Sequence, residues 1–363
     1  MTIADSPMSE SPQPKPALAT RLFATFGPAL ILAAVILLFI ALLARKDIVD
    51  QMQSAELKGW GGFTKAAGEC TFDGLKAFLS FATFKTVLTQ TVVVALASLG
   101  MTMIIVSAGI DLSVGSVVAL STVTGALLIQ KGVGLPGVLV AGLGVGALVG
   151  AANGALVAAF RLTPFIVTLG MLGAARGVAK WLAGNQTVNF KESNIGVLMT
   201  DPDPLGAVPP PGVWVAIALA LLMAVVMRQT VFGRHIFAIG SNEATARLCG
   251  IRVRAMKVAI YTLAGLLFGL AGVMMLSRLQ QGDPTSAVGL ELDVVAAVVI
   301  GGASLSGGTG SILGAMIGAL TMAVLRTGSQ YMDWPSYMQE IIIGVLIIAA
   351  VGLDKWRQSR AAN

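Results

Sequence analysis

An aspartate and a serine in one short turn, Asp111 and Ser113, are the first residues whose types and spacing could do chemistry. They belong to the segment Gly-Ile-Asp-Leu-Ser-Val-Gly at 109–115, which lies between two long apolar runs. A carboxylate so close to apolar sequence is costly, so it marks a functional site or one whose hydrogen bonds are all satisfied. An aspartate near a serine also starts helices, where its oxygen accepts backbone N–H bonds. Both interpretations stay open: a place on a path for polar solutes, or a capped turn.

A glycine-rich run at 301–311, which contains Ser304 and Ser306, is the second such segment. Glycine-rich loops can hold phosphate, but that motif needs a Gly-Lys pair, and the sequence contains none. The composition instead indicates the end of a broken helix, where backbone lines a cavity or is buried in protein. The run resembles the 109–116 segment, which indicates either an internal duplication or shared turn chemistry.

Histidine and cysteine are too scarce for most metal and catalytic chemistry. His235 is the only histidine, and the two cysteines, Cys70 and Cys249, are expected on opposite sides of a membrane. A histidine-based metal site or proton relay is therefore excluded, and no cluster of catalytic groups is apparent. We expect no metal, no cofactor and no enzymatic activity in this chain.

The composition is that of an all-α protein embedded in a lipid bilayer. Of 363 residues, 56% are hydrophobic and only 12% are charged, and the mean hydropathy is +0.84. Soluble domains contain about 25% charged residues. The net charge of +6 is explained by cytoplasmic loops of a membrane protein and does not indicate a nucleic-acid partner.

Ten apolar segments are candidates for membrane-spanning helices, which need about 20 apolar residues. The fifth and the eighth could be broken or re-entrant. The ten segments are 26–44, 87–108, 113–130, 135–160, 165–183, 213–227, 258–277, 294–303, 312–325 and 338–351.

The distribution of charge predicts which loops face the cytoplasm. The segment 228–257 carries six basic residues besides His235 and a single acid, Glu243, and the tail 355–363 is also basic. By the positive-inside rule both are cytoplasmic, and with ten spans so is the N-terminus. Residues 1–20 are then a disordered cytoplasmic tail, ahead of a membrane-spanning domain at 21–354. The two remaining long segments, 47–84 and the proline-rich 184–212, are then external. Arg45 and Lys46 at the outer end of the first span do not fit the positive-inside rule in this orientation.

Glycines recur at intervals of four in three of the spans, which places them on one helix face. Such faces let neighbouring backbones approach closely, so we expect a compact helix bundle, with a pore-lining role as the alternative. The glycines are Gly142, Gly146, Gly150 and Gly154 in the fourth span, Gly265 and Gly269 in the seventh, and Gly310, Gly314 and Gly318 at the ninth.

Three basic residues fall inside spans: Arg176, Lys180 and Arg326. Extension of their side chains to the membrane surface explains them, and a polar contact to a substrate is the alternative.

The basic segment 228–257 contains a predicted two-turn helix. Ser241 or Asn242 is a good N-cap ahead of Glu243, the following residues form helices readily, and Gly250 is a natural stop. A helix this short is not stable alone, so it must dock on its own bundle or in the groove of a partner.

Together these segments resemble the permease subunits of ribose/xylose/galactose-type ABC sugar importers, within the branched-chain amino acid and monosaccharide permease superfamily. Besides 109–115 and 299–310, the resemblance includes Asn153-Gly154, the run Thr-Pro-Phe-Ile-Val-Thr-Leu-Gly at 163–170, which contains Thr168, and the basic segment. It covers roughly residues 86–353, and Ala108 departs from the usual second glycine.

The resemblance implies a fold similar to the ten-helix cobalamin-importer permease and a dimer of permeases. Its expected partners are a separate cytoplasmic ABC ATPase and a periplasmic sugar-binding protein. The short helix then looks like the coupling helix, with Gly240, Asn242, Glu243, Ala244, Arg247, Gly250 and Ile251 as the coupling residues. Asp111, Ser113, Thr168, Ser304 and Ser306 are the candidates for the translocation path or its gate.

We therefore expect the chain to import a monosaccharide across the bacterial inner membrane. The alternative is an ion-coupled secondary transporter of a small polar solute. That class needs buried carboxylates, and Asp111 is the only strong candidate, because Asp293 and Glu340 are expected near the outer surface.

Overall fold

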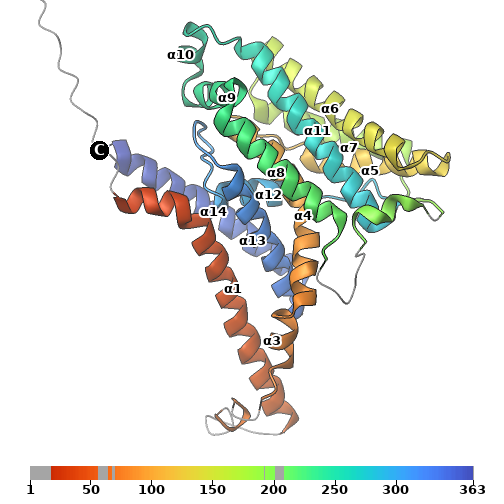
Figure 1. Ribbon diagram of the computed structural model, residues 1–363, viewed down its shortest axis with the longest axis vertical. Coiled ribbons are helices and arrows are strands. Elements are labelled where there is room, and N and C mark those ends of the chain that lie inside the picture. The colour runs from red at the N-terminus through yellow and green to blue at the C-terminus, as the bar shows by residue number, and fades with distance from the viewer. Residues whose placement is uncertain (1–17, 56–63, 68–69, 192, 201–207, 363) are drawn as a thin grey trace, which may run out of the picture.

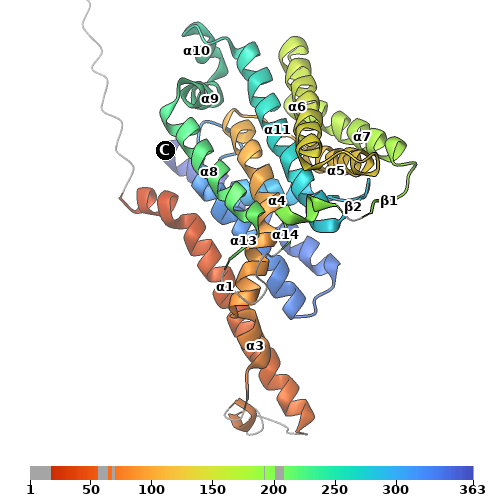
Figure 2. The ribbon, with the colours of Figure 1, turned by 45° about the vertical axis from the view of Figure 1, so that its right-hand side comes forward.

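The chain folds into a bundle of helices (Figure 1). This computed structural model describes residues 18–55, 64–67, 70–191, 193–200 and 208–362. In that part of the chain the strands are two residues long: β1 (Val188–Asn189) pairs antiparallel with β2 (Gln281–Gly282), as Figure 2 shows. The predicted all-α class is confirmed.

Each of the ten predicted apolar segments lies in or overlaps a helix. The longer elements are α1 (Leu18–Ser54), α4 (Phe81–Val106), α5 (Val114–Gln130), α6 (Leu135–Phe160), α7 (Pro164–Leu182), α8 (Pro211–Gln229), α11 (Val253–Leu279), α13 (Ile312–Tyr331) and α14 (Ser336–Ala362). The shorter ones are α3 (Asp73–Phe78), the 3₁₀ helix η1 (Asn194–Leu198), α9 (Val231–Ser241), α10 (Glu243–Leu248) and α12 (Leu290–Ile300).

Seven of these helices are long and apolar enough to cross a membrane within the described residues: α1, α4, α6, α7, α8, α11 and α13. The apolar parts of α5 and α14 are shorter, and α12 has only 11 residues. The chain is thus a multi-pass membrane protein. Since α12 is too short for a full crossing, the eighth predicted span is an incomplete one.

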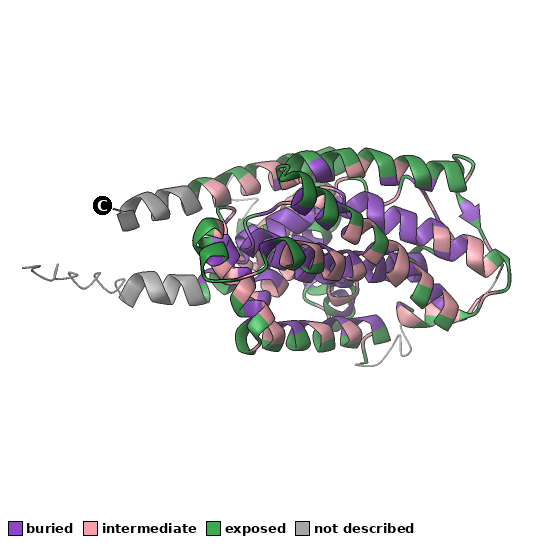
Figure 3. Cartoon of the chain, turned by 90° about the horizontal axis from the view of Figure 1, so that it is seen from above, coloured by how far each residue is buried: buried purple, intermediate pink, exposed green. Residues whose placement is uncertain are grey.

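Helices α4 and α11 form the centre of the bundle. Most residues of both are buried, and in Figure 3 buried residues lie in the middle while exposed ones lie around the outside. Helix α11 lies against α6 along the faces where both carry glycine. A Cβ on Gly146 would overlap the carbonyl oxygen of Gly265 and lie 2.7 Å from the amide nitrogen of Gly269. Close backbone approach therefore holds this pair of helices together.

The other glycines at intervals of four also lie at helix–helix contacts. Gly142, Gly150 and Gly154 continue the α6 face against α11. Gly314 and Gly318 of α13 lie against the backbone of Gly301 and Ala297, while Gly310 lies near Val106 and Ala303.

Helix α1 continues past its predicted end at residue 44 and runs to Ser54, away from the body of the bundle (Figure 1). Lys46 near that end donates to Asp333 Oδ2 at 2.5 Å and to the carbonyl of Tyr331 at 3.1 Å. The segment 47–84, predicted as a loop with a small helix, is therefore largely helical where it is described: it holds the end of α1, α3 and the start of α4.

Both predicted tails overlap the ends of helices. Helix α1 starts at Leu18, inside the tail predicted for residues 1–20, whose first 17 residues lie outside the described part. Helix α14 continues to Ala362, so the tail predicted for 355–363 is largely the end of a helix. In the proline-rich segment, Pro202 and Pro204 lie outside the described residues, and Pro211 begins α8.

Candidate functional site

Three segments that are far apart in the sequence meet at one end of the bundle, at the carboxyl end of α4. The carbonyl of Val106 accepts a hydrogen bond from the amide of Gly308 at 2.9 Å, which joins the two motif turns. Gly240 of α9 packs directly against the carbonyl group of Val106. A Cβ atom at position 240 would overlap the Val106 oxygen and lie 2.6 Å from the amide nitrogen of Gly308. Helix α9 therefore contacts both the carboxyl end of α4, just ahead of the first turn, and the glycine-rich turn.

The predicted short helix of the basic segment is present as α10 (Glu243–Leu248). The Asn242 side chain accepts a hydrogen bond from the amide of Thr245 at 2.9 Å, so it caps the helix start. Gly250 has a φ of +85°, and this left-handed conformation turns the chain toward α11. Ile251 follows this turn and packs with the cluster formed by Ile239, Ala246 and Val253.

One face of α10 is docked and the other is free. Ala246 is buried against Ile239 of α9 and Val253 of α11. Ala244 and Leu248 point outward, and Leu248 is 88% exposed. The outward face of α10 therefore presents an exposed apolar side chain.

An ion-pair network fixes the docked helix. Glu243 accepts from Arg247 at 2.8 Å and from Lys257 of α11 at 2.7 Å. Partial burial alone would raise the pKa of Glu243, but these two pairs outweigh it and lower the pKa below its usual range. The carboxylate therefore stays charged and ties α10 to α11 at neutral pH.

Helix α9 was not predicted from the sequence, where its residues were treated as a linker. Thr230 caps it by accepting from the amide of Gly233 at 3.2 Å, and its apolar face buries Ile236 and Ile239. Thr230, a good N-cap, stands ahead of apolar residues spaced three apart, Ile236 and Ile239, and this pattern could have predicted the helix.

Asp111 lies in a fully satisfied turn. It is 1% exposed, and its Oδ1 accepts from the amide of Ser113 at 2.8 Å and from the Ser113 hydroxyl at 2.6 Å. Its Oδ2 accepts from the Asn153 amide at 3.3 Å. Both oxygens are thus engaged within the protein, as a capped turn requires, and the role of Asp111 on a path for solutes stays a prediction.

Thr168 ties α7 to the same turn. Its hydroxyl accepts from the amide of Leu112 at 3.1 Å and donates to the carbonyl of Ile110 at 3.2 Å. Ser304 and Ser306 instead lie in the glycine-rich turn, where the Ser304 hydroxyl accepts from the Ser306 amide at 3.2 Å. Four of the five predicted path residues thus lie in two turns, and the fifth, Thr168 of α7, contacts the first of them.

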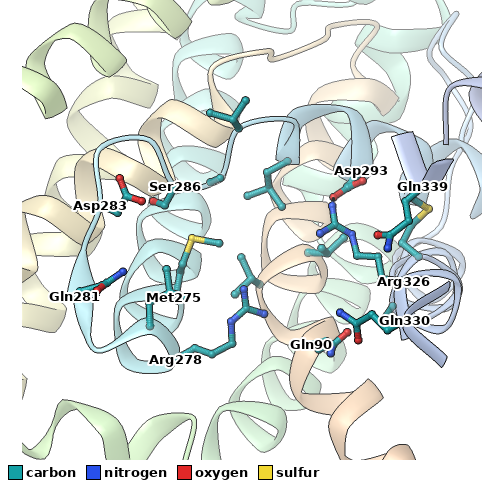
Figure 4. Close-up of a pocket in the computed structure, with 18 residues that line it drawn as sticks. Gln90, Met275, Arg278, Gln281, Asp283, Ser286, Asp293, Arg326, Gln330 and Gln339 are labelled. Atoms are coloured by element: carbon teal, nitrogen blue, oxygen red, sulfur yellow. Dashed lines mark hydrogen bonds and ion pairs between the residues drawn. The ribbon is translucent and has the colours of Figure 1, made fainter. Parts of the chain in front are cut away.

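A polar chamber lies at another place, near β2 and the amino end of α12 (Figure 4). Its volume is about 560 Å³, and none of the five predicted path residues lines it. We call it the arginine chamber, and its polar lining consists of Gln90, Arg278, Gln281, Asp283, Ser286, Asp293, Arg326, Gln330 and Gln339.

Two arginines dominate this chamber. Arg326 forms an ion pair with Asp293, whose side chain is only 2% exposed. Arg278 has no hydrogen-bond or ion-pair partner among the described residues, and its guanidinium lies beside the cavity in Figure 4. Asp283 accepts from the amide and the hydroxyl of Thr285, both at 2.7 Å. The chamber therefore balances two cations with two carboxylates.

Sequence reasoning named Arg326 as a residue that extends to the membrane surface or contacts a substrate, and Asp293 as a carboxylate near the outer surface, but it did not predict the chamber. Its polar residues come from α4, α11, α12, α13, α14 and the segment before α12. The one sequence feature that most of these polar residues share is that they lie near the ends of apolar segments.

Comparison with known proteins identifies the family. The model of the family described as branched-chain amino acid transport system / permease component matches residues 83–351. The ribose import permease protein of Escherichia coli K12 is 41% identical over 281 residues, which are 75% of this chain and 85% of that protein.

Two further relatives are similar in extent. The fructose import permease protein of Rhizobium meliloti is 37% identical, covering 78% of this chain and 81% of that protein. The L-arabinose ABC transporter permease protein of Azospirillum brasilense is 35% identical, covering 74% and 79%. No solved structure matches the chain. The chain therefore belongs to the permease-component family of branched-chain amino acid transport systems, and it is a transport subunit rather than an enzyme.

Proposed function

We propose that this chain is the membrane permease of an ABC importer and carries a monosaccharide from the periplasm across the bacterial inner membrane. The relatives named for ribose, fructose and L-arabinose support the substrate class. The observation that carries the mechanism is α10, docked on one face and exposed at Leu248 on the other. A separate ATPase, a periplasmic sugar-binding protein and a second permease copy are the partners in this proposal.

The proposed topology has ten membrane segments, with both termini and the α9–α10 segment in the cytoplasm. The six basic residues of 228–257 support this orientation. The start of α1 and the end of α14 lie near each other in Figures 1 and 2, as termini on one side of the membrane would.

In this proposal α10 receives movement of the ATPase, and α9 passes it into the bundle. Asn242, Glu243, Arg247, Gly250 and Ile251 hold the helix in place, and Ala244 with Leu248 forms its outward contact. Because the Glu243 network and the buried Ala246 hold α10 firmly, displacement of Leu248 moves α9 with it. Gly240 then acts on the Val106 carbonyl and the Gly308 amide without an intervening side chain.

The arginine chamber is the proposed place where the sugar first meets the permease. Sugar hydroxyls both donate and accept hydrogen bonds, and the chamber offers both through its arginines, glutamines and carboxylates. Since the charges of Arg278 and Arg326 are balanced by Asp283 and Asp293, the chamber favours a neutral polar solute over an ion.

The test is uptake by the reconstituted system. The chain, its ATPase and its binding protein are placed in proteoliposomes, and uptake of labelled ribose, fructose and L-arabinose is measured with and without ATP. We expect accumulation of one of these sugars that depends on ATP. Accumulation by the chain alone on a proton or sodium gradient would instead establish the secondary transporter.

A further inference from the structure

A second cavity, which the proposed function does not use, lies where α6 ends and α11 begins. Its volume is about 140 Å³, and its charged lining consists of Arg161, Glu243, Arg247, Arg254 and Lys257. Four basic side chains thus face one carboxylate.

The single carboxylate is already engaged. Glu243 accepts from Arg247 at 2.8 Å and from Lys257 at 2.7 Å. Neither Arg161 nor Arg254 has a carboxylate partner among the described residues, and both are exposed. Two guanidinium groups with free donors therefore remain beside one small cavity, which is an arrangement that suits a phosphate group.

The position of the cavity relative to the membrane indicates which kind of molecule would supply that phosphate group. Helices α6 and α11 are both long and apolar enough to span a membrane, and the cavity lies at their shared end. Apolar side chains are exposed around this end of α6: Leu162, which lines the cavity, Phe160, which precedes Arg161 and is 67% exposed, and Phe165 at the start of α7. A lipid tail would cover these three residues while its phosphate lies among the arginines.

We propose that this cavity binds the headgroup of an anionic phospholipid, such as phosphatidylglycerol, in the cytoplasmic leaflet. Basic pockets between membrane helices on that side recognise such headgroups. The phosphate contacts Arg161 of the α6–α7 turn and Arg254 of α11, next to the Glu243 network that holds α10. A bound anionic lipid therefore stabilises the docked position of α10. An acidic surface of a soluble partner fits less well, because it would leave Phe160 and Phe165 uncovered.

The experiment measures lipid binding to the full chain in detergent, by native mass spectrometry with dioleoyl phosphatidylglycerol and dioleoyl phosphatidylcholine. The double variant Arg161→Gln/Arg254→Gln is compared with Arg234→Gln/Arg252→Gln, which removes the same charge from the basic segment outside the cavity. We expect the wild type to prefer phosphatidylglycerol by about tenfold or more, as two arginines near an anionic headgroup would produce. The first double variant should lose this preference and the control should keep it.

Three results would overturn the proposal. The first is an unchanged preference in Arg161→Gln/Arg254→Gln, or an equal loss in the control pair. The second is loss of the wild-type preference in millimolar inorganic phosphate, which would make the site one for a free anion. The third is absence of lipid preference in the wild type together with loss of ATPase co-purification in the first variant, which would assign the arginines to the protein partner. As a check on folding, the unfolding temperatures of the wild type and the two double variants are measured in phosphatidylcholine alone. Equal temperatures for the three proteins show that the variants fold.

Discussion

Replacement of Gly146 by alanine tests the contact between α6 and α11 that organises the bundle. The new Cβ would overlap the Gly265 carbonyl oxygen and lie 2.7 Å from Gly269 N, well inside the 3.4 Å at which ordinary contact begins. Both neighbours are backbone atoms, so no side chain can rotate away, and the two helices must separate. Gly144, two residues earlier on α6, has nothing within 4 Å of the position that a new methyl group would take, and it is the matched control.

The expected cost follows from overpacking. Extra methyl groups in a packed interior cost about 1–3 kcal/mol, and the upper part of that range applies because the obstacle is backbone. For a large domain this corresponds to a fall in Tm of about 4–8 °C. Gly144→Ala adds the same methyl group without a clash, so its Tm should equal or slightly exceed that of the wild type.

The assay is thermal unfolding of the purified chain in one detergent, which is monitored as the loss of the monodisperse peak after heating. Gly146→Ala should fall clearly below both the wild type and Gly144→Ala. If both variants melted within a degree of the wild type, the close contact between α6 and α11 would be wrong.

Three further predictions concern the polar contacts. Asp111→Ala removes the acceptor of the buried Ser113 amide and hydroxyl and one of the two acceptors of the Asn153 amide, so it should destabilise the chain by about 1–3 kcal/mol, whereas Asp111→Asn should cost less; equal melting of the two would contradict the capped turn. Lys46→Met breaks an exposed pair with Asp333, so the free energy of unfolding should change by less than about 1 kcal/mol, and a larger loss would mean that this pair fixes α1. The lowered pKa of Glu243 stabilises α10 above the usual glutamate range, and this stabilisation is lost as pH falls through the folded pKa. Limited proteolysis of the α9–α10 segment should therefore accelerate in acid in the wild type but not in Glu243→Gln.

The sequence was sufficient for features whose cause is local. The bounds of α6 were predicted to the residue, because Pro136 follows a glycine turn and the apolar run then continues without interruption to Phe160. The short helix α10 was predicted from Asn242 and Gly250, a cap and a stop that act within two turns. Apolar composition likewise predicted the all-α membrane bundle.

Features that depend on distant contacts could not be predicted. Helix α1 continues past the charged Arg45–Lys46 pair, and Lys46 there contacts Asp333, 287 residues away, which no local pattern indicates. The hydrogen bond from Asn153 to Asp111 joins residues 42 positions apart, so no local pattern could predict it. The arginine chamber combines residues of five helices, so no single stretch of sequence contained its signal.

The central claim is that α10 couples a separate ATPase to the bundle, and its most direct measurement uses the exposed apolar side chain of that helix. ATP hydrolysis and sugar uptake are measured together in proteoliposomes with Leu248→Asp, and with Cys249→Ser as the control at the neighbouring exposed position. We predict that Leu248→Asp loses uptake and sugar-stimulated ATP hydrolysis together, while Cys249→Ser keeps both. Wild-type uptake in Leu248→Asp, with hydrolysis equally unchanged, would contradict the coupling role of α10.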